Sequence, residues 1–275
     1  MKKNLVYFCI LFQKSYADLL ELLLLSMREY GCLNPETTDI LLITESGFKD
    51  DILAQVARSG FSIKVWALNI PCSILTAAAS RMYIFEWPEV SQYDKFLYMD
   101  VDILVTGNIN TLLDIPIERT KIYAVEDLTL SSEYHGSQFH PSPPTVDMSA
   151  PAFSSGILMF HNSSEIKDLF RATNEFIYDY MHVKMNSIPG CLDQPFLVYM
   201  AAVRNMMYDV STISRFVILG RSPENVVDGI VLYHFCGYLG YPSPKKVEMV
   251  KFIVTLLNYK SGQNGTAGLR ISDYE

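Results

Sequence analysis

The 275-residue sequence has no long apolar run, few cysteines and no surplus of positive charge. No stretch of about 18 uncharged apolar residues occurs, so we expect no transmembrane segment. The 5 cysteines are scattered without a CxxC pair, which favours reduced thiols in a cytoplasmic protein over a disulfide framework. The formal net charge of -8 gives the protein no overall basic surface, and we therefore expect no nucleic-acid partner.

The sequence also lacks internal repeats, a domain linker and a glycine-rich phosphate-binding loop near the N-terminus. The absence of that loop argues against a nucleotidyltransferase. A composition that is 49% hydrophobic and 19% charged excludes a disordered chain. The length suits one large domain with a buried core. We predict a single domain over residues 1–257 and a flexible C-terminal tail over 258–275, where Gly, Ser and Asn are frequent.

Strand-like apolar runs alternate with helix-like segments along most of the chain. This alternation is typical of a mostly parallel central sheet flanked by helices, so the predicted fold class is α/β. The predicted strands cover residues 4–12, 39–44, 62–68, 95–99, 121–125, 153–160 and 231–235. The predicted helices cover residues 16–30, 48–59, 76–87, 109–113, 165–182, 193–203 and 244–257.

The N-terminal segment allows two interpretations. Lys2 and Lys3, followed by the apolar run 5–12, resemble a short signal peptide. The same run is short and rich in β-forming residues, as expected of a buried strand. Gln13 and Lys14 do not suit a cleavage site, and we therefore favour the strand.

Residues 128–152 interrupt the alternation of strands and helices. The segment contains His135, His140, several prolines and many serines, and it shows no periodic pattern. A loop of this length inside a compact domain is usually functional or mobile. It suits a lid that excludes water from a reactive sugar, or an ordinary surface excursion. Neither histidine has a partner at a spacing typical of metal binding.

The triplet Asp100-Val101-Asp102 follows directly on the apolar strand 95–99. Because successive strand residues point to opposite faces, the two carboxylates can project the same way. Ligands of open α/β sheets bind beyond the carboxyl ends of the strands. Two neighbouring carboxylates repel each other unless a cation lies between them, and Mn²⁺ or Mg²⁺ would leave coordination positions for phosphate oxygens. The triplet therefore predicts a metal site, although Asp-x-Asp without such a strand is a weak motif.

Several blocks, in this order along the chain, together resemble a known enzyme family. They are the first loop 13–17, the strand and metal motif 93–105 with its continuation 107–114, the strand 153–160, the pair Asp193-Gln194, and the block 234–237. Their pattern is similar to glycosyltransferase family 8, the retaining GT-A enzymes that include glycogenin and bacterial lipopolysaccharide galactosyltransferases. The resemblance extends from about residue 5 to about residue 250 and implies a GT-A, Rossmann-like nucleotide-diphospho-sugar transferase fold.

The resemblance also implies a role for the residues in each block. Asp100, Asp102 and His234 would bind the metal ion. Asp193 and Gln194 would face the transferred sugar and take part in catalysis. The donor would further contact Phe12, Tyr16, Arg81, Val101, Ser154 and Gly237.

These positions also have structural interpretations. Asp193 suits the N-cap of a helix, and Gln194 suits an exposed polar residue. His234 could be a core histidine whose hydrogen bonds are satisfied. Arg81 could form a surface salt bridge, and Tyr16 could pack in the core. The ordered agreement of the blocks favours the functional interpretation.

Two positions depart from the family pattern. The family usually has a lysine six residues after the metal-binding histidine, where it contacts the diphosphate, but this chain has Gly240. Lys245 or Lys246 could supply the missing charge. Ser154 stands where the family usually has Asn, which shortens a side chain expected to contact donor or acceptor. Both departures affect the identity of the donor more than the fold or the reaction type.

We therefore expect a metal-dependent retaining glycosyltransferase. The resemblance implies that it moves a hexose from a UDP-sugar, galactose or glucose, to a hydroxyl of a glycan, glycolipid or protein acceptor. Two alternatives remain open. The first is a metal-dependent nucleotidyl or phosphoryl enzyme that uses the same Asp-x-Asp chemistry. The second is a degenerate GT-A domain that binds nucleotide-sugars without turnover.

Overall fold

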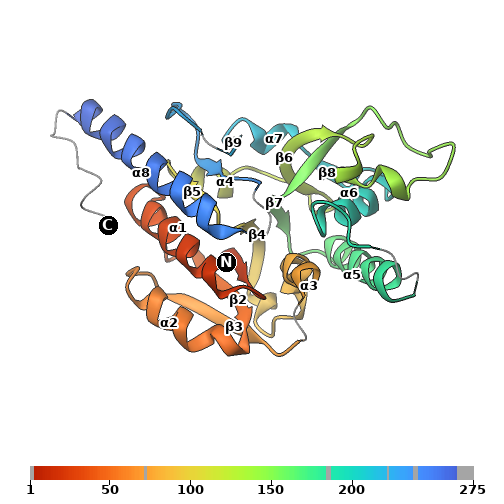
Figure 1. Ribbon diagram of the computed structural model, residues 1–275, viewed down its shortest axis with the longest axis horizontal. Helices are drawn as coiled ribbons and strands as arrows, with labels where there is room; N and C mark the ends of the chain where they lie inside the picture. The colour runs from red at the N-terminus through yellow and green to blue at the C-terminus, as the bar shows by residue number, and fades with distance from the viewer. Residues whose placement is uncertain (1–2, 71–72, 184–186, 222, 238–240, 265–275) are drawn as a thin grey trace.

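The computed structural model describes residues 3–70, 73–183, 187–221, 223–237 and 241–264 (Figure 1). In this described part of the chain, none of the helices has the length and apolar character needed to span a bilayer. The described cysteines are free thiols: Cys9, Cys32, Cys191 and Cys236.

A seven-stranded sheet forms the centre of the molecule. Its strands are β1 (Lys3–Ile10), β2 (Thr38–Glu45), β3 (Ile63–Leu68), β4 (Tyr93–Met99), β6 (Ile122–Thr129), β7 (Pro151–His161) and β8 (Tyr208–Asp209). The strand order is β3-β2-β1-β4-β7-β6-β8. The pairings of β7 with β4 and with β6 are antiparallel, and the other pairings are parallel. The prediction of an α/β fold with a mostly parallel sheet is confirmed.

The N-terminal apolar run lies in the interior of this sheet. β1 pairs with β2 on one side and with β4 on the other, so the strand interpretation is confirmed. Leu5, Val6, Tyr7 and Phe8 are all fully buried, because both faces of the sheet are covered. The strand ends at Ile10, two positions before the predicted end, and the chain then enters the site described below.

Helices cover both faces of the sheet (Figure 1). They are α1 (Ala17–Tyr30), α2 (Lys49–Ala57), α3 (Ile74–Ala79), α4 (Asn110–Leu113), α5 (Ser164–Tyr178), α6 (Gln194–Val203), α7 (Ser211–Ser214) and α8 (Pro242–Asn264). Helices α1, α2 and α8 share one apolar core with the sheet face that carries Val6 and Phe8. Helices α5 and α6 share a second core with the opposite face, which carries Leu5 and Tyr7. Alternate side chains of β1 thus pack into two separate apolar cores.

A second, three-stranded sheet lies beside the large one. It contains β5 (Ile103–Val105), β9 (Val217–Leu219) and β10 (Leu232–His234). The chain passes from β4 in the large sheet to β5 in the small sheet through residues 100–102. β10 runs antiparallel to β5, with His234 opposite Ile103. This pairing brings the end of β10 next to the Asp100-Val101-Asp102 triplet.

Some predicted helices have different boundaries or a different type. The predicted helix 76–87 begins as α3 and continues as a 3₁₀ helix over Ser80–Glu86. The predicted helix 165–182 is α5 followed by a π-helix over Asp179–Val183. Helix α8 continues past the predicted end at 257 to Asn264, while residues 265–275 of the predicted tail lie outside the described residues. The remaining 3₁₀ helices are Lys14–Tyr16, Ser46–Phe48, Val90–Gln92, Glu133–His135 and Ser137–Phe139.

The segment predicted as a loop, 128–152, is packed against the rest of the domain. Strands β6 and β7 extend into its two ends, and two 3₁₀ helices lie between them. Leu130 and His135 are fully buried. The ring of Phe139 stacks on Phe196 of α6, with 4.9 Å between the ring centroids. The interior of this segment therefore contributes to the core, and its function as a lid stays a prediction.

Candidate active site

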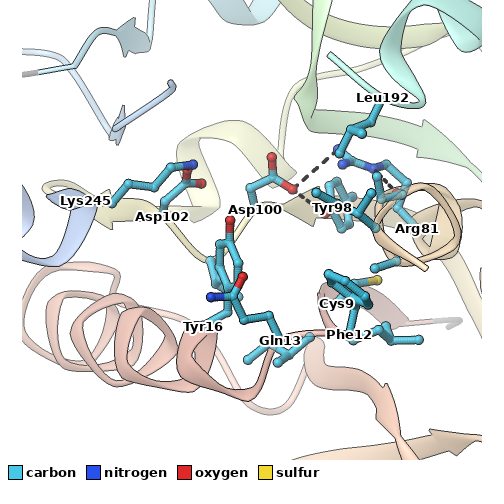
Figure 2. Close-up of a pocket in the computed structure, with 16 residues that line it drawn as sticks. Cys9, Phe12, Gln13, Tyr16, Arg81, Tyr98, Asp100, Asp102, Leu192 and Lys245 are labelled. Atoms are coloured by element: carbon cyan, nitrogen blue, oxygen red, sulfur yellow. Dashed lines mark hydrogen bonds and ion pairs between the residues drawn. The ribbon is translucent and has the colours of Figure 1, made fainter. Parts of the chain in front are cut away.

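A pocket opens at the carboxyl ends of the parallel strands β1 and β4 (Figure 2). It offers about 720 Å³ of space, part of it open to solvent. Small-molecule sites span roughly 300–1,000 Å³, so the pocket is large enough for a substrate. Its lining includes six of the predicted site residues and one of the two candidate lysines: Phe12, Tyr16, Arg81, Asp100, Val101, Asp102 and Lys245.

The charged residues are arranged around Asp100. Figure 2 shows Asp102 and Lys245 on one side of it, and Arg81 and Tyr98 on the other. The remaining predicted residues are not among the lining residues of the pocket. Of these, Ser154, Asp193, Gln194 and His234 are buried, and Gly237 is partly buried.

Asp100, Asp102 and His234 form a compact group of possible metal ligands. One ligand atom from each lies within 4.8 Å of the others. Nε2 of His234 lies 3.3 Å from Oδ1 of Asp102 and 3.8 Å from Oδ2 of Asp100. Oδ1 of Asp102 is buried without a hydrogen-bond partner among the described residues. Buried polar atoms are rarely left unpaired, so a cation such as Mn²⁺ or Mg²⁺ fits this group.

The geometry of the triplet differs from the predicted one. Residues 100–102 form a bend between two sheets rather than the end of a strand, so strand alternation does not orient the carboxylates. The backbone N–H of Asp100 donates to the carbonyl of Gly156 at 2.8 Å. The backbone N–H of Phe235 donates to the carbonyl of Asp102 at 2.9 Å. The triplet is therefore fixed by β7 on one side and by the end of β10 on the other.

Gly156 of β7 leaves space for Asp100, Asp102 and His234, which we call the metal group. A Cβ at this position would lie 2.3 Å from Cε1 of His234 and 2.9 Å from Oδ2 of Asp100. Both distances are shorter than side chains tolerate, so any larger residue would push the two ligands away. The glycine of the predicted strand block thus has a steric role in this chain.

Arg81 is buried and connects the metal group to Asp193. Its Nε lies 3.2 Å from Oδ2 of Asp193, and its Nη1 lies 3.4 Å from Oδ1 of Asp100. Nη1 also donates to the carbonyl of Ser155, and the guanidinium lies 4.6 Å from the ring centre of Tyr98. Burial by itself would lower the pKa of Arg81, but Asp100 and Asp193 outweigh this effect and hold it above its usual value. Arg81 is therefore a permanent buried cation and not a surface residue.

Asp193 stands at the N-cap position of α6, but its side chain makes no capping hydrogen bond. The prediction that it caps the helix is therefore wrong for the side chain, which is directed at Arg81 instead. Nη2 of Arg81 donates to Oδ1 of Asp193 at 3.5 Å. Burial raises the pKa of Asp193 to about 6, although Arg81 opposes the rise. This carboxyl group therefore titrates close to neutral pH.

The turn that delivers Asp193 is strained. Cys191 and Leu192, which precede it, have φ angles of 61° and 56°, in the left-handed region that non-glycine residues avoid. Such conformations cost about 1–3 kcal/mol each and persist where packing enforces them. The side chain of Leu192 packs with Leu75 and Phe196 and also lines the pocket. This packing holds the turn in the position that places Asp193 against Arg81.

Gln194 is buried and connects three segments, so it is not the exposed residue of the structural interpretation. Its Oε1 accepts a hydrogen bond from the backbone N–H of Ser155 at 3.0 Å. Its Nε2 donates to the carbonyl of Tyr134 at 3.3 Å and lies 3.2 Å from Nε2 of His135. His135 in turn lies 3.3 Å from Oδ2 of Asp127. The sequence offered no partner for His135, but the structure places it next to the predicted catalytic pair.

Lys245 and Lys246 have different environments. Nζ of Lys245 forms a hydrogen-bonded ion pair with Oδ2 of Asp102, and its side chain is only 8% exposed. Nζ of Lys246 pairs with Asp18 on the surface, at 3.3 Å. Burial by itself would raise the pKa of Asp102, but Lys245 and His234 outweigh it and hold the pKa well below its usual value. Gly240, where the family has its lysine, lies outside the described residues.

Phe12 and Tyr16 line the pocket where β1 leads into α1 (Figure 2). Phe12 is 49% exposed, and its backbone N–H donates to Glu45 at 3.1 Å. An exposed ring at a pocket edge offers a stacking surface for a base. Two predicted donor contacts, Ser154 and Gly237, do not line the pocket. Oγ of Ser154 accepts a hydrogen bond from its own strand, and Gly237 has a left-handed φ of 101°.

Tyr98 and Cys9 are pocket residues that were not predicted as site residues from the sequence. The hydroxyl group of Tyr98 donates to Oδ1 of Asp100, from a position two residues earlier in the chain. A tyrosine at that spacing from the motif was the available signal. Cys9 lines the pocket beside β1, and burial raises its pKa to about 12, so its thiol stays protonated.

Comparison with known proteins gives one family and several related structures. The family model described as Glycosyl transferase family 8 matches residues 62–239. The structure of the galactosyltransferase LgtC in complex with donor and acceptor sugar analogs matches with a TM-score of 0.60 and 14% sequence identity, covering 97% of this chain and 97% of that chain. No curated protein has a significant match to the sequence.

Two further solved structures share the arrangement of elements. The apo structure of the bifunctional glycosyltransferase WbbM matches with a TM-score of 0.56 and 15% identity. This match covers 95% of this chain but only 51% of WbbM, so the chain spans about half of that protein. The apo form of mouse xyloside xylosyltransferase 1 matches with a TM-score of 0.55 and 11% identity, covering 87% of this chain and 99% of that chain. At these identities the similarity shows the fold.

Proposed function

Because the chain belongs to glycosyltransferase family 8, we propose that it moves a hexose from a UDP-sugar to a hydroxyl group of a glycan, glycolipid or protein. The chain is a glycosyltransferase with a GT-A fold and a metal-binding group. The UDP-sugar, the choice of Mn²⁺ or Mg²⁺ and the acceptor are the proposed part. One observation carries the proposal: Asp100, Asp102 and His234 gather beside a pocket that is also lined by the exposed ring of Phe12 and the partly buried ring of Tyr16.

The pocket offers a separate environment for each part of such a donor. Phe12 and Tyr16 supply aromatic surface for a base. Asp100, Asp102 and His234 would hold a divalent ion, and Lys245 adds a cation beside them, which suits an anionic diphosphate. The sugar would then lie toward Arg81, with Asp193 and Gln194 behind it.

The chemistry of the transfer follows from these charges. A bound divalent ion supplies electrostatic stabilisation of the leaving diphosphate. Arg81 pairs with both oxygens of Asp193, through Nε at 3.2 Å and Nη2 at 3.5 Å, which keeps the carboxylate directed toward the proposed sugar side of the pocket. A carboxylate in that position stabilises the positive charge that develops on a sugar as its bond to the leaving group breaks. Gln194 holds the Ser155 peptide, whose carbonyl fixes Arg81.

Retention of configuration is part of the proposal. It requires either a nucleophile on the sugar face next to Asp193 or a leaving group that guides attack from its own face. Tight fixation of Asp193 by Arg81 favours an electrostatic role for this carboxylate.

The free thiols support a cytoplasmic location. The ion pair of Lys245 with Asp102 places a cation in the pocket despite Gly240, and turnover in the assay below separates the transferase from the degenerate binding module.

The test is a UDP-release assay with a panel of UDP-sugars, in Mn²⁺, in Mg²⁺ and with chelator. We expect slow hydrolysis of one donor that needs the metal and that Asp102→Ala abolishes. Asp168→Ala, on the exposed surface of α5, is the matched control and should behave as wild type. If no UDP-sugar binds or is hydrolysed with either ion, the proposed donor class is wrong.

A further inference from the structure

Lys245 is a buried lysine that lies on a metal ligand. Lysines are almost never buried unless they are paired, and its partner here is Oδ2 of Asp102. The other oxygen, Oδ1, faces His234 at 3.3 Å. The ammonium group therefore occupies one oxygen of the carboxylate that the metal group contributes to a cation.

The two buried cations of the site differ in how firmly they are held. Arg81 is fixed from several directions, by Asp193, Asp100 and the Ser155 carbonyl. Lys245 extends from the first turn of α8 on a flexible four-carbon stem, and the residue lines the pocket. The ammonium group of Lys245, with Asp102 as its ion-pair partner, is therefore less constrained than the guanidinium of Arg81.

We propose that Lys245 is a built-in counter-ion that competes with the divalent metal for Asp102, and that a diphosphate relieves this competition by drawing the ammonium group away. This inference rests on the proposed function, because it needs a diphosphate donor in the same pocket. Two cations a few ångströms apart repel each other strongly in a buried site. Metal affinity is therefore lower while Lys245 remains on Asp102. By linkage, the metal and the diphosphate strengthen each other's binding.

The test measures the affinity of the full chain for Mn²⁺ by the electron paramagnetic resonance signal of the free ion, with and without UDP. Without UDP, Lys245→Met should bind Mn²⁺ roughly 10-fold more tightly than wild type, within the usual range of such couplings. UDP should tighten Mn²⁺ binding by a larger factor in wild type than in Lys245→Met. Lys246→Met removes a surface lysine next in sequence and should leave both affinities unchanged.

Further variants separate charge from packing. Lys245→Arg keeps a cation and should not bind Mn²⁺ more tightly than wild type. Lys245→Gln keeps a donor for Asp102 without the charge and should behave as Lys245→Met, which guards against a Met variant that fails to fold. The inference is overturned if both neutral variants bind Mn²⁺ no more tightly than wild type. A wild-type chain that binds neither Mn²⁺ nor UDP would instead overturn the proposed function itself.

Discussion

Asp102 lines the charged pocket at one end, Asp193 lies behind Arg81 at the other, and their carboxyl groups behave in opposite ways. Both are buried, at 3% and 1% exposure. The pKa of Asp102 lies well below its usual range, whereas burial raises the pKa of Asp193 to about 6. Burial alone therefore does not decide the charge of a carboxyl group in this site.

The difference lies in how the partners are shared. Asp102 has Lys245 and His234 close to it, and these outweigh the cost of burial. Asp193 forms an ion pair with Arg81, but Arg81 also pairs with Asp100. The negative charge of Asp100 raises the pKa of Asp193 further. One end of the pocket is thus permanently charged and suited to holding a cation. The other end responds to pH in the neutral range.

The largest effect is expected from a substitution at Asp102, which should lower both turnover and metal affinity. Asp102→Asn should lower turnover of the UDP-sugar by about 10³-fold or more, because an electrostatic group of the site is lost. Its affinity for Mn²⁺ should fall as well, since Asp102 belongs to the metal group. Initial rates of UDP release and Mn²⁺ titration measure the two effects. Asp168→Asn on exposed α5 should change neither.

At the opposite end, Asp193→Asn should lower turnover by roughly 10²-fold while Mn²⁺ affinity stays near that of wild type. Asp193 contacts Arg81 and is not part of the metal group, which explains the separation. The measurement is kcat together with the Mn²⁺ dissociation constant. A loss of Mn²⁺ affinity as large as that of Asp102→Asn would show that the two ends are not independent.

The contrast in pKa also predicts how stability depends on pH. Asp193 has a pKa of about 6 in the folded chain, against its usual value of 3.8, so its contribution to stability is fully present below pH 3.8 and is lost as pH rises through about 6. This shift corresponds to at most roughly 3 kcal/mol. Urea unfolding with chelator should show the free energy of unfolding of wild type falling relative to Asp193→Asn between pH 4 and pH 7. A difference that stays flat or rises would contradict the raised pKa.

The smallest effect is expected at Gly156, which leaves space for the metal ligands His234 and Asp100. Gly156→Ala should weaken Mn²⁺ binding by about 10-fold, because the new methyl group displaces His234 and Asp100. Gly47→Ala is the control, since a Cβ at Gly47 meets nothing within 4 Å. Isothermal titration with Mn²⁺ would compare the two variants. Wild-type affinity in Gly156→Ala would mean that the ligands move aside without loss.

The central sheet could be predicted from the sequence because its signal is local. The apolar runs of β1, β2 and β4 are long enough to show a pattern, and both faces of the sheet are buried. The short strands β5, β8 and β9 carry too few residues for any pattern. They form only because neighbouring segments pair with them. The bend at residues 100–102 was not predicted either, because it also depends on neighbouring segments that the local sequence does not show.

The candidate site was partly predictable. Asp100 and Asp102 followed from a motif after a strand, whereas His234 came from family resemblance, and the structure brings the three together. The partners of Arg81 and Lys245 could not be predicted. They depend on contacts between residues far apart in the chain, such as Lys245 with Asp102. Sequence periodicity reports which residues are buried and carries no information on which buried charges meet.

The metal group lies on the seam between the two sheets. Asp100 follows the last strand residue of β4 in the large sheet, whereas His234 is the last residue of β10 in the small sheet. A divalent ion held by both would cross-link the two sheets, as a disulfide bond links two segments. Unlike a disulfide bond, this link could be removed with a chelator. Removing it should speed amide hydrogen exchange in β5, β9 and β10 well before it affects β1 and β2. The small sheet would then report the occupancy of the site.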